Sequence, residues 1–153
     1  MDHIDKRILS LLQADSTLAV SDLAERVGLS ASSCWRRVQQ MEEAGVIAAR
    51  VALLDRQAVN VAVTVFVSLR TSQHSVEWLS AFSRSIGDIP EIVEVYRMSG
   101  QVDYLLKIVV PDIAAYDAVY KKLIARVDLF DVSSAFAMEL MKCTTALPLS
   151  YVK

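Results

Sequence analysis

The chain has 153 residues, of which 54% are hydrophobic, and its 16 Lys and Arg against 18 Asp and Glu give a formal net charge of −2 at pH 7. Its mean hydropathy of +0.35 is high for a globular chain. No apolar run approaches the ~18 residues of a membrane-spanning helix, and the first residues, MDHIDKR, are charged. These features argue against a membrane protein and a secretory leader. We therefore expect a cytoplasmic chain of one large or two small domains that buries its surplus apolar surface in subunit contacts.

Residues of the types used in metal and redox sites are scattered along the chain. Cys34 and Cys143 are far apart in the sequence, and His3 and His74 have no cysteine nearby. This spacing indicates neither a disulfide framework nor a metal-ligand cluster. We expect reduced thiols, no metal and no cofactor.

The N-terminal segment predicts a helix. Its apolar residues Ile4, Ile8, Leu11 and Leu12 recur at the spacing of one helix face. Asp2 stands where a capping carboxylate would begin that helix.

Residues 21–47 predict two further short helices joined by a glycine turn. Ser21 is placed to cap the first of them, Gly28 supplies a permissive backbone for the turn, and Ser30 is placed to cap the second. The apolar face of the first consists of Leu23, Ala24 and Val27. Together with the N-terminal helix, these segments have the outline of a DNA-binding helix-turn-helix.

The second helix of this pair has two distinct faces, and Gly45 ends it. Its predicted buried stripe is Cys34, Val38 and Met41. Its opposite face consists of Ser32, Arg36, Gln39, Gln40 and Glu43. Hydroxyl, guanidinium and amide groups near a helix N-terminus suit contacts with phosphates and base edges in a major groove. The alternative is the solvated face of an ordinary helical hairpin.

Arg36 is the preferred candidate for DNA contact. Arg37 lies nearer the buried stripe and has the alternative of an ion pair with an acid such as Glu25. The residues predicted to contact DNA are Ser21, Ser30, Ser32, Ser33, Arg36, Arg37, Gln40 and Arg50. Within residues 1–50 the acids outnumber Lys and Arg by seven to six. Phosphate neutralisation by one copy is therefore weak, and useful affinity requires several copies to bind together.

Residues 46–54 are apolar and partly β-branched, with Arg50 among them. The run predicts a short strand or wing, and Arg50 is placed to reach a backbone phosphate. A winged helix-turn-helix domain is therefore expected over residues 1–54.

After a connector of residues 55–60, residues 61–153 predict a second domain in the order strand, helix, strand, strand, helix, strand. The predicted strands are residues 61–69, 92–98, 104–110 and 132–141, and the predicted helices are residues 76–86 and the segment after Asp112. Ser75 and Asp112 stand at the starts of these helices. The order is that of a ferredoxin-like βαββαβ sandwich, so the chain is predicted to be of the α+β class.

The strands of this predicted sheet are apolar on both faces. Val63, Val65 and Val67 share one face of the first strand, yet Phe66 points to the other. Helices cover only one face of such a sandwich, so the second face needs a partner. A second copy, sheet against sheet, places two helix-turn-helix units on one duplex.

The chain resembles the Lrp/AsnC family, the leucine-responsive and asparagine-responsive transcription regulators. The resemblance rests on DHIDKRILSLLQ, LAERVGLSASSCWRRVQQMEEAGVI and ALLD in the first half, and on YRMSGQVDYLLKIVVPDIAAYDAVYKKLI and MKCTTALPL in the second. A departure is Ala31, where family members often have proline, but alanine is a good helix former. The resemblance implies a sequence-specific regulator of amino-acid metabolism or transport that assembles into dimers, often tetramers or octamers.

The resemblance also implies a small effector, usually an amino acid, bound between dimers near the hairpin that joins the two middle strands. Carried over residue by residue, this site is Met98, Ser99, Gly100, Gln101, Val102, Asp103 and Tyr104. A glycine turn leaves backbone groups free for an α-carboxylate and an α-amine, and Asp103 can accept from an ammonium. The alternative is an ordinary hairpin that Asp103 caps.

Other functions find less support in the sequence. No Ser/His/Asp, Cys/His or paired-carboxylate arrangement and no glycine-rich phosphate loop is visible, so an enzyme is not expected. Some porphyrin-processing decarboxylases resemble the same two-domain frame, but the scarcity of histidine argues against that function. An architectural protein that organises DNA without an effector is the other alternative.

Overall fold

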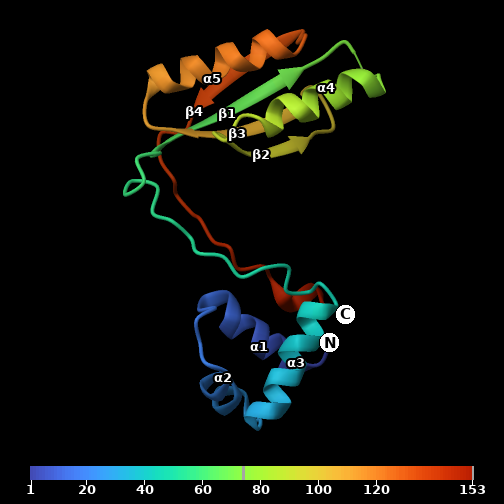
Figure 1. Cartoon of the computed structure of the whole chain (residues 1–153), viewed down its shortest axis with the longest axis vertical. Helices are drawn as coiled ribbons and strands as arrows, with labels where there is room; N and C mark the ends of the chain where they lie inside the picture. Colours follow the sequence, from blue (N-terminus) through green and yellow to red (C-terminus); the bar gives the residue numbers. More distant parts are fainter. Residues whose placement is uncertain (74, 153) are drawn as a thin grey trace. The chain divides into compact units, whose positions relative to one another are not determined.

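The computed structural model describes residues 1–73 and 75–152, so His74, for which no metal role is expected, lies outside the described residues. The chain forms two compact units, which are Met1–Leu53 together with Met141–Lys153, and Leu54–Leu140 (Figure 1). The second unit ends at Leu140, so in the structure residues 141–152 pack with the first unit, whereas the sequence analysis assigns them to the sheet domain.

The first unit is built on three helices. These are α1 (His3–Ala14), α2 (Val20–Val27) and α3 (Ala31–Glu43). Asp2 caps α1 as predicted, through a reciprocal pair in which the Asp5 N–H donates to Asp2 Oδ1 and the Asp2 N–H donates to Asp5 Oδ2, both at 2.9 Å. Because these bonds satisfy two backbone donors, the first turn of α1 is fixed by its own sequence.

The turn between α2 and α3 forms where the glycine signal predicts it. Gly28 has φ of 73°, a left-handed conformation that favours glycine. The Ser30 side chain caps α3 as predicted. The prediction that Ser21 caps α2 is wrong, since α2 begins at Val20 and its N-cap residue Ala19 makes no side-chain cap. Val20 packs against the core of the unit, and the helix begins two residues before the start that a Ser21 cap would give.

The core of the first unit joins all three helices. Its buried residues are Ile8, Leu9, Leu23, Ala24, Val27, Cys34, Val38 and Met41. The C-terminal segment adds to it, because Leu149 packs against this cluster and Lys6 Nζ donates to the Val152 carbonyl at 2.9 Å. Gln13 fixes the same segment through two bonds to the Leu147 backbone, at 2.6 Å and 3.2 Å. These long-range contacts explain why the chain ends in the first unit.

The strand or wing predicted for residues 46–54 does not form. All of these residues are described, and none is in a strand. Val51 and Leu53 are exposed instead. A strand needs a neighbour to hydrogen-bond with, and no segment of the described chain pairs with this one.

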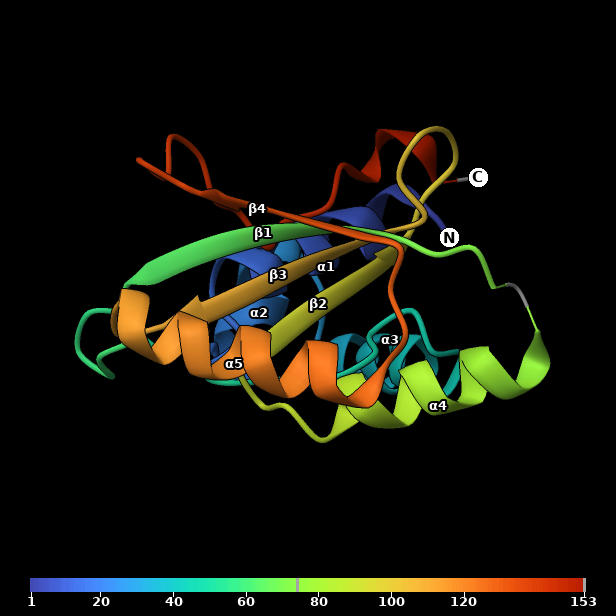
Figure 2. The ribbon, with the colours of Figure 1, turned by 90° about the horizontal axis from the view of Figure 1, so that it is seen from above.

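The second unit is the predicted ferredoxin-like sandwich. Its elements are β1 (Val63–Arg70), α4 (Val76–Gly87), β2 (Ile92–Arg97), β3 (Tyr104–Val110), α5 (Ile113–Arg126) and β4 (Asp131–Phe136). The strand order is β2-β3-β1-β4, with antiparallel pairs throughout. Helices α4 and α5 lie along the same face of the sheet (Figure 2). Ser75 and Asp112 cap them as predicted.

The last strand is shorter than predicted. It ends at Phe136, whereas the apolar run predicts a strand as far as residue 141. The Ala137 N–H still donates to the Thr64 carbonyl of β1 at 2.9 Å. Beyond Ala137 the chain leaves β1, and Met138 and Met141 are almost fully exposed. The apolar residues of this run therefore extend past the sheet that could pair with them.

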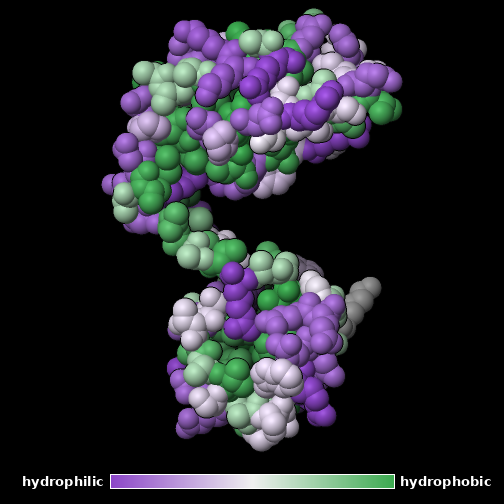
Figure 3. Space-filling view, viewed as in Figure 1, coloured by the Kyte–Doolittle hydropathy of each residue, from purple (hydrophilic) through white to green (hydrophobic). Residues whose placement is uncertain are grey.

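The two faces of the sheet differ as the alternation of β1 predicts. Val65, Val67 and Leu69 are fully buried against α4 and α5, while Phe66 is 38% exposed on the opposite face. Tyr96 and Leu105 lie opposite each other on that second face, which we call the open face. Hydrophobic side chains reach the surface of this unit among hydrophilic ones (Figure 3).

The open face also carries a polar cluster. Lys107 Nζ donates to Glu94 Oε1 at 2.5 Å, and the Tyr96 hydroxyl donates to Glu94 Oε2 at 2.7 Å. The Lys107 ammonium and the Tyr96 hydroxyl together hold the pKa of Glu94 below its ordinary value. The open face is therefore mixed, since Phe66 and Leu105 are apolar whereas Ser68, Ser133 and the pair of Lys107 with Glu94 are polar.

Candidate functional site

The exposed side of α3 presents the residues predicted for DNA contact. Ser32, Arg36 and Gln40 are exposed, and each is four residues from the next, so they follow one side of the helix. Cys34, Val38 and Met41 are buried on the other side, as predicted. The prediction missed Trp35, whose side chain is 54% exposed beside Arg36. A tryptophan beside a predicted buried position is usually expected in the core. The hydrophobic spacing of α3 therefore gave no signal that Trp35 is exposed.

Three serine hydroxyls gather at the N-terminus of α3. Ser30 Oγ accepts the Ser33 N–H at 3.3 Å and lies 3.0 Å from Ser33 Oγ and 3.3 Å from Ser32 Oγ. The first turn of a helix carries free N–H groups and a partial positive charge. Hydroxyls and N–H groups together at this point are suited to a phosphate oxygen.

Arg37 is held away from the exposed side of α3. Its Nη1 lies 2.7 Å from Asp2 Oδ2 and 2.7 Å from Asp5 Oδ1, the two carboxylates that cap α1. The backbone N–H of Asp5 and then the Arg37 guanidinium lower the pKa of Asp2 to about 2. The predicted alternative for Arg37, an ion pair, is therefore the one that forms, but with Asp2 and Asp5 in place of Glu25.

The two remaining candidates for DNA contact have partners of their own. Arg50 Nη2 lies 2.9 Å from Glu42 Oε1, which places Arg50 at the C-terminal end of α3. Ser21 Oγ donates to Asp22 Oδ1 at 3.2 Å in the first turn of α2. The structure thus gathers the serines and Arg36 at the first half of α3 and places Arg50 at its far end.

The hairpin between β2 and β3 is fastened to the end of β1. Asp103 Oδ2 accepts the Thr71 N–H at 2.8 Å, and the Asp103 N–H donates to the Leu69 carbonyl at 3.0 Å. Gly100 has φ of 109°, which favours glycine at the tip. The Asp103 carboxylate therefore ties the hairpin to the segment that follows β1, a contact outside the hairpin itself.

An open hollow of about 330 Å³ lies beside this hairpin. It is lined by Arg70, Thr71, Ser72, Gly100, Gln101, Asp103 and Phe130. The Arg70 guanidinium lies over the Phe130 ring, 5.4 Å from its centroid. The sequence identified only the three hairpin residues of this set. Of the other four, Arg70 ends β1, Thr71 and Ser72 follow it, and Phe130 precedes β4. Only the antiparallel pairing of β1 with β3 and with β4 brings them to the hairpin.

Tyr104 does not lie with the other predicted effector residues. Its side chain is 8% exposed, and its ring centroid lies 4.6 Å from that of Phe82 and 5.8 Å from that of Trp78. Tyr104 is thus a core residue on the helix-covered face of β3. Met98, by contrast, is exposed.

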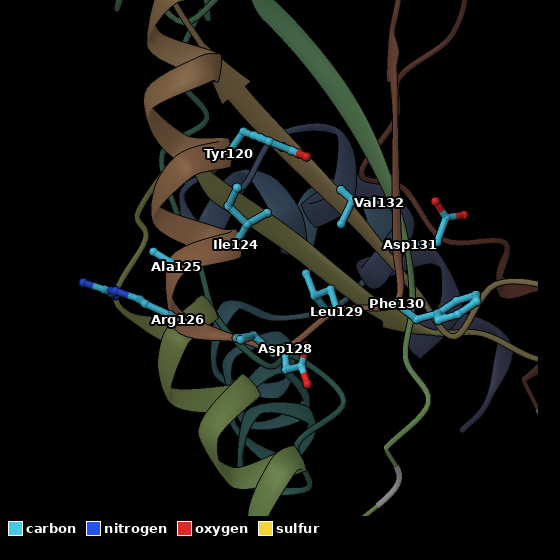
Figure 4. Close-up of a pocket in the computed structure, with 10 residues that line it drawn as sticks. Tyr120, Ile124, Ala125, Arg126, Asp128, Leu129, Phe130, Asp131 and Val132 are labelled. Atoms are coloured by element: carbon cyan, nitrogen blue, oxygen red, sulfur yellow. The ribbon is translucent and has the colours of Figure 1, made fainter.

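A second hollow, of about 640 Å³, lies between the end of α5 and the segment that enters β4 (Figure 4). Its residues belong to the run from Tyr120 to Val132. Tyr120, Ile124, Leu129 and Val132 surround its middle, while the Arg126 side chain extends away from it (Figure 4). None of the DNA-binding or effector-binding residues predicted from the sequence lines this hollow.

The cysteines and acidic residues form no evident metal centre. Within residues 1–73 and 75–152, no three His, Cys, Asp or Glu side chains are grouped so that they could hold a metal ion. Burial raises the pKa of the Cys34 thiol, which makes it a poor nucleophile. No helix in the described part of the chain is long and apolar enough to span a membrane.

Comparison with known proteins agrees with both halves of the structure. Residues 1–48 match the model of a winged helix-turn-helix DNA-binding domain, and residues 64–147 match the model of the Lrp/AsnC ligand binding domain. The glutamate uptake regulatory protein of Zymomonas mobilis is 48% identical over 149 residues, which are 97% of this chain and 91% of that protein.

Two solved structures extend this agreement over the whole chain. An AsnC family transcriptional regulator from Agrobacterium tumefaciens is 64% identical, with a TM-score of 0.97 and 100% of each chain covered. A transcriptional regulator from Neisseria meningitidis, solved as a complex with L-Met, is 32% identical, with a TM-score of 0.94 over 100% of this chain and 99% of that chain. The chain therefore belongs to the Lrp/AsnC family of transcription regulators.

Proposed function

We propose that the chain is a sequence-specific DNA-binding regulator of genes for amino-acid metabolism or transport, and that an amino acid modulates it. DNA binding is supported by the exposed side of α3. There Ser32, Arg36 and Gln40 lie along one side of the helix, and further serines lie at the N-terminus of the helix. Such a helix fits the major groove with its N-terminal half toward the bases.

Arg36 is the cation assigned to DNA, because Arg37 is already engaged by two carboxylates. Replacement of Arg36 by alanine is expected to weaken binding about 10-fold to 100-fold if its guanidinium reads a base. The probe is a duplex selected by the wild-type protein from a random library, titrated in gel shifts at fixed salt. Arg84→Ala, which removes an arginine from α4 in the other unit, is the matched control. Equal affinity of Arg36→Ala and the wild type would remove Arg36 from the interface.

The functional form is proposed to be a homodimer joined through the open face, with tetramers or octamers built from it. Phe66 and Tyr96 on that face are exposed in one copy, and the acidic balance of residues 1–50 makes one copy a weak DNA binder. Two copies place two α3 helices on one duplex roughly one turn, ~34 Å, apart. Because its target is DNA, the protein is assigned to the cytoplasm.

The effector is proposed to be an amino acid bound at the hollow beside the hairpin. Arg70 supplies a cation for an α-carboxylate, and Asp103 supplies a carboxylate for an α-ammonium. The relative from Neisseria meningitidis solved with L-Met supports this class of ligand.

A thermal-shift screen with the twenty amino acids tests the effector assignment, because a ligand of the folded state raises the melting temperature by mass action. The amino acid that binds should also change the DNA affinity. If none of the twenty changes either quantity, the effector assignment fails and a DNA-organising protein without an effector is the better description.

A further inference from the structure

Trp35 differs from the other large hydrophobic residues in the helices of the first unit because its side chain is exposed. Over α1, α2 and α3, all of whose residues the structure describes, it is the one large hydrophobic side chain that stays exposed, at 54%. It lies in the second turn of α3, three residues after Ser32 and directly before Arg36. An indole that stays in water contributes little to the folding free energy of the unit. Its place directly before Arg36, in the helix proposed to contact DNA, makes the indole a candidate for contact with a base.

The chemistry of the indole narrows what it can contact in a DNA groove. An indole has one N–H donor and no acceptor, so most of its exposed surface is apolar. The edges of the bases in a major groove present hydrogen-bond donors and acceptors, and the largest apolar group among them is the C5-methyl group of thymine. An indole placed over any other base edge would leave hydrogen-bonding groups of that base covered and unpaired. Among the base edges, the methyl group of thymine is the partner that best suits the apolar surface of the indole.

We propose that Trp35 is a specificity-determining residue, which selects thymine at one position of each half-site by packing its indole on the C5-methyl group. This inference rests on the proposed DNA-binding function. It assigns base preference to a side chain that lies beside the polar residues Ser32, Arg36 and Gln40 on the exposed side of α3. Arg36 and the serines would then supply the polar contacts to base edges and phosphates, while Trp35 supplies the preference for thymine.

The test removes the methyl group from the DNA and the indole from the protein. Duplexes are first selected from a random library with the wild-type protein, and each thymine of the selected duplex is then replaced in turn by uracil, which lacks only that methyl. One uracil position should weaken wild-type binding roughly fourfold, the factor that burial of one methyl group is worth. The same replacement should leave the affinity of Trp35→Ala unchanged, and Trp35→Phe should keep part of the sensitivity.

Arg36→Ala is the control for a general loss of binding, since it should bind less tightly yet keep the wild-type ratio of thymine to uracil affinities. Circular dichroism confirms that Trp35→Ala is folded, as expected for an exposed residue. If Trp35→Ala keeps the full uracil sensitivity, or weakens all duplexes equally, the assignment of Trp35 to thymine is wrong. If the wild-type protein enriches no duplex at all, the proposed function itself fails, which is a different result.

Discussion

Arg36 and Arg37 are neighbours in the sequence with opposite surroundings. Arg36 is exposed on the proposed DNA side of α3, whereas Arg37 reaches Asp2 and Asp5 at 2.7 Å each. The same two carboxylates cap α1, so Arg37 joins the start of one helix to the middle of another. Its proposed part in DNA binding is to hold α3 in place.

Replacement of Arg37 by alanine is expected to lower the melting temperature at pH 7, because two carboxylates lose their shared cation. The folded pKa of Asp2 is about 2, below its ordinary value of 3.8. The stabilisation is therefore complete above about pH 4 and is lost as the pH falls toward 2. Thermal melts at pH 7 and pH 2.5 measure the difference between variant and wild type, which should shrink at the lower pH. Arg36→Ala is the control, and a difference of the same size at both pH values would contradict the role of the ion pair.

Asp103 permits a second test at the residue scale, since its cap and its charge can be separated. Asp103→Asn keeps an oxygen that can accept the Thr71 N–H but removes the charge, whereas Asp103→Ala removes both. We expect Asp103→Asn to fold and bind DNA normally but to lose the effect of the amino acid found in the thermal screen. Asp103→Ala should in addition lose about 1 kcal/mol of stability. DNA titrations with and without that amino acid distinguish a ligand contact from a structural role of Asp103. If the amino acid changes the DNA affinity of Asp103→Asn as much as that of the wild type, Asp103 has only the structural role.

At the scale of elements, the turn between α2 and α3 depends on the backbone of Gly28. A Cβ at Gly28 would meet no atom within 4 Å, so its φ of 73° is the only obstacle to another residue. Gly28→Ala is therefore expected to destabilise the first unit by about 1 kcal/mol, the strain of a left-handed alanine. Gly87→Ala is the matched comparison, because Gly87 is also uncrowded but ends α4 without a positive φ.

Alanine at Gly87 should raise stability by about 0.5 kcal/mol, since it restricts the unfolded chain and favours a helix. Urea denaturation followed by circular dichroism measures both variants. Equal effects of the same sign at the two glycines would show that φ does not decide the outcome at Gly28.

At the scale of the whole molecule, the open face of the sheet is proposed to join two copies. Phe66 lies at its centre and faces Lys107 across the β1 and β3 pair. Phe66→Glu should keep the fold of one copy, because Lys107 lies beside the new carboxylate, but it should place a charge in the proposed dimer contact. Sedimentation velocity is expected to show at least a dimer for the wild type and a monomer for the variant.

DNA affinity should fall with the loss of the dimer, since the two α3 helices no longer bind as a linked pair. Val76→Glu is the control, because Val76 is 75% exposed in the first turn of α4, away from the open face. A wild-type protein that sediments as a monomer at micromolar concentration, or a Phe66→Glu variant that stays dimeric, would contradict the proposed assembly.

The sequence by itself determined the elements whose signals are local. Asp2, Ser30 and Asp112 cap helices, Gly28 sets a turn, and the alternation in β1 separates a buried face from an open one. Each of these signals acts over a few residues, so it can be recognised without knowing where the rest of the chain lies.

Tertiary structure decided whatever depends on residues far apart in the chain. Four features depend on contacts between residues more than 20 positions apart. They are the place of residues 141–152 in the first unit, the partners of Arg37, the burial of Tyr104, and the position of Arg70 and Phe130 beside the hairpin. The failed strand at residues 46–54 has the same origin. A run of apolar residues carries the propensity for a strand, but only a neighbouring strand can supply its hydrogen bonds, and no local pattern specifies that neighbour.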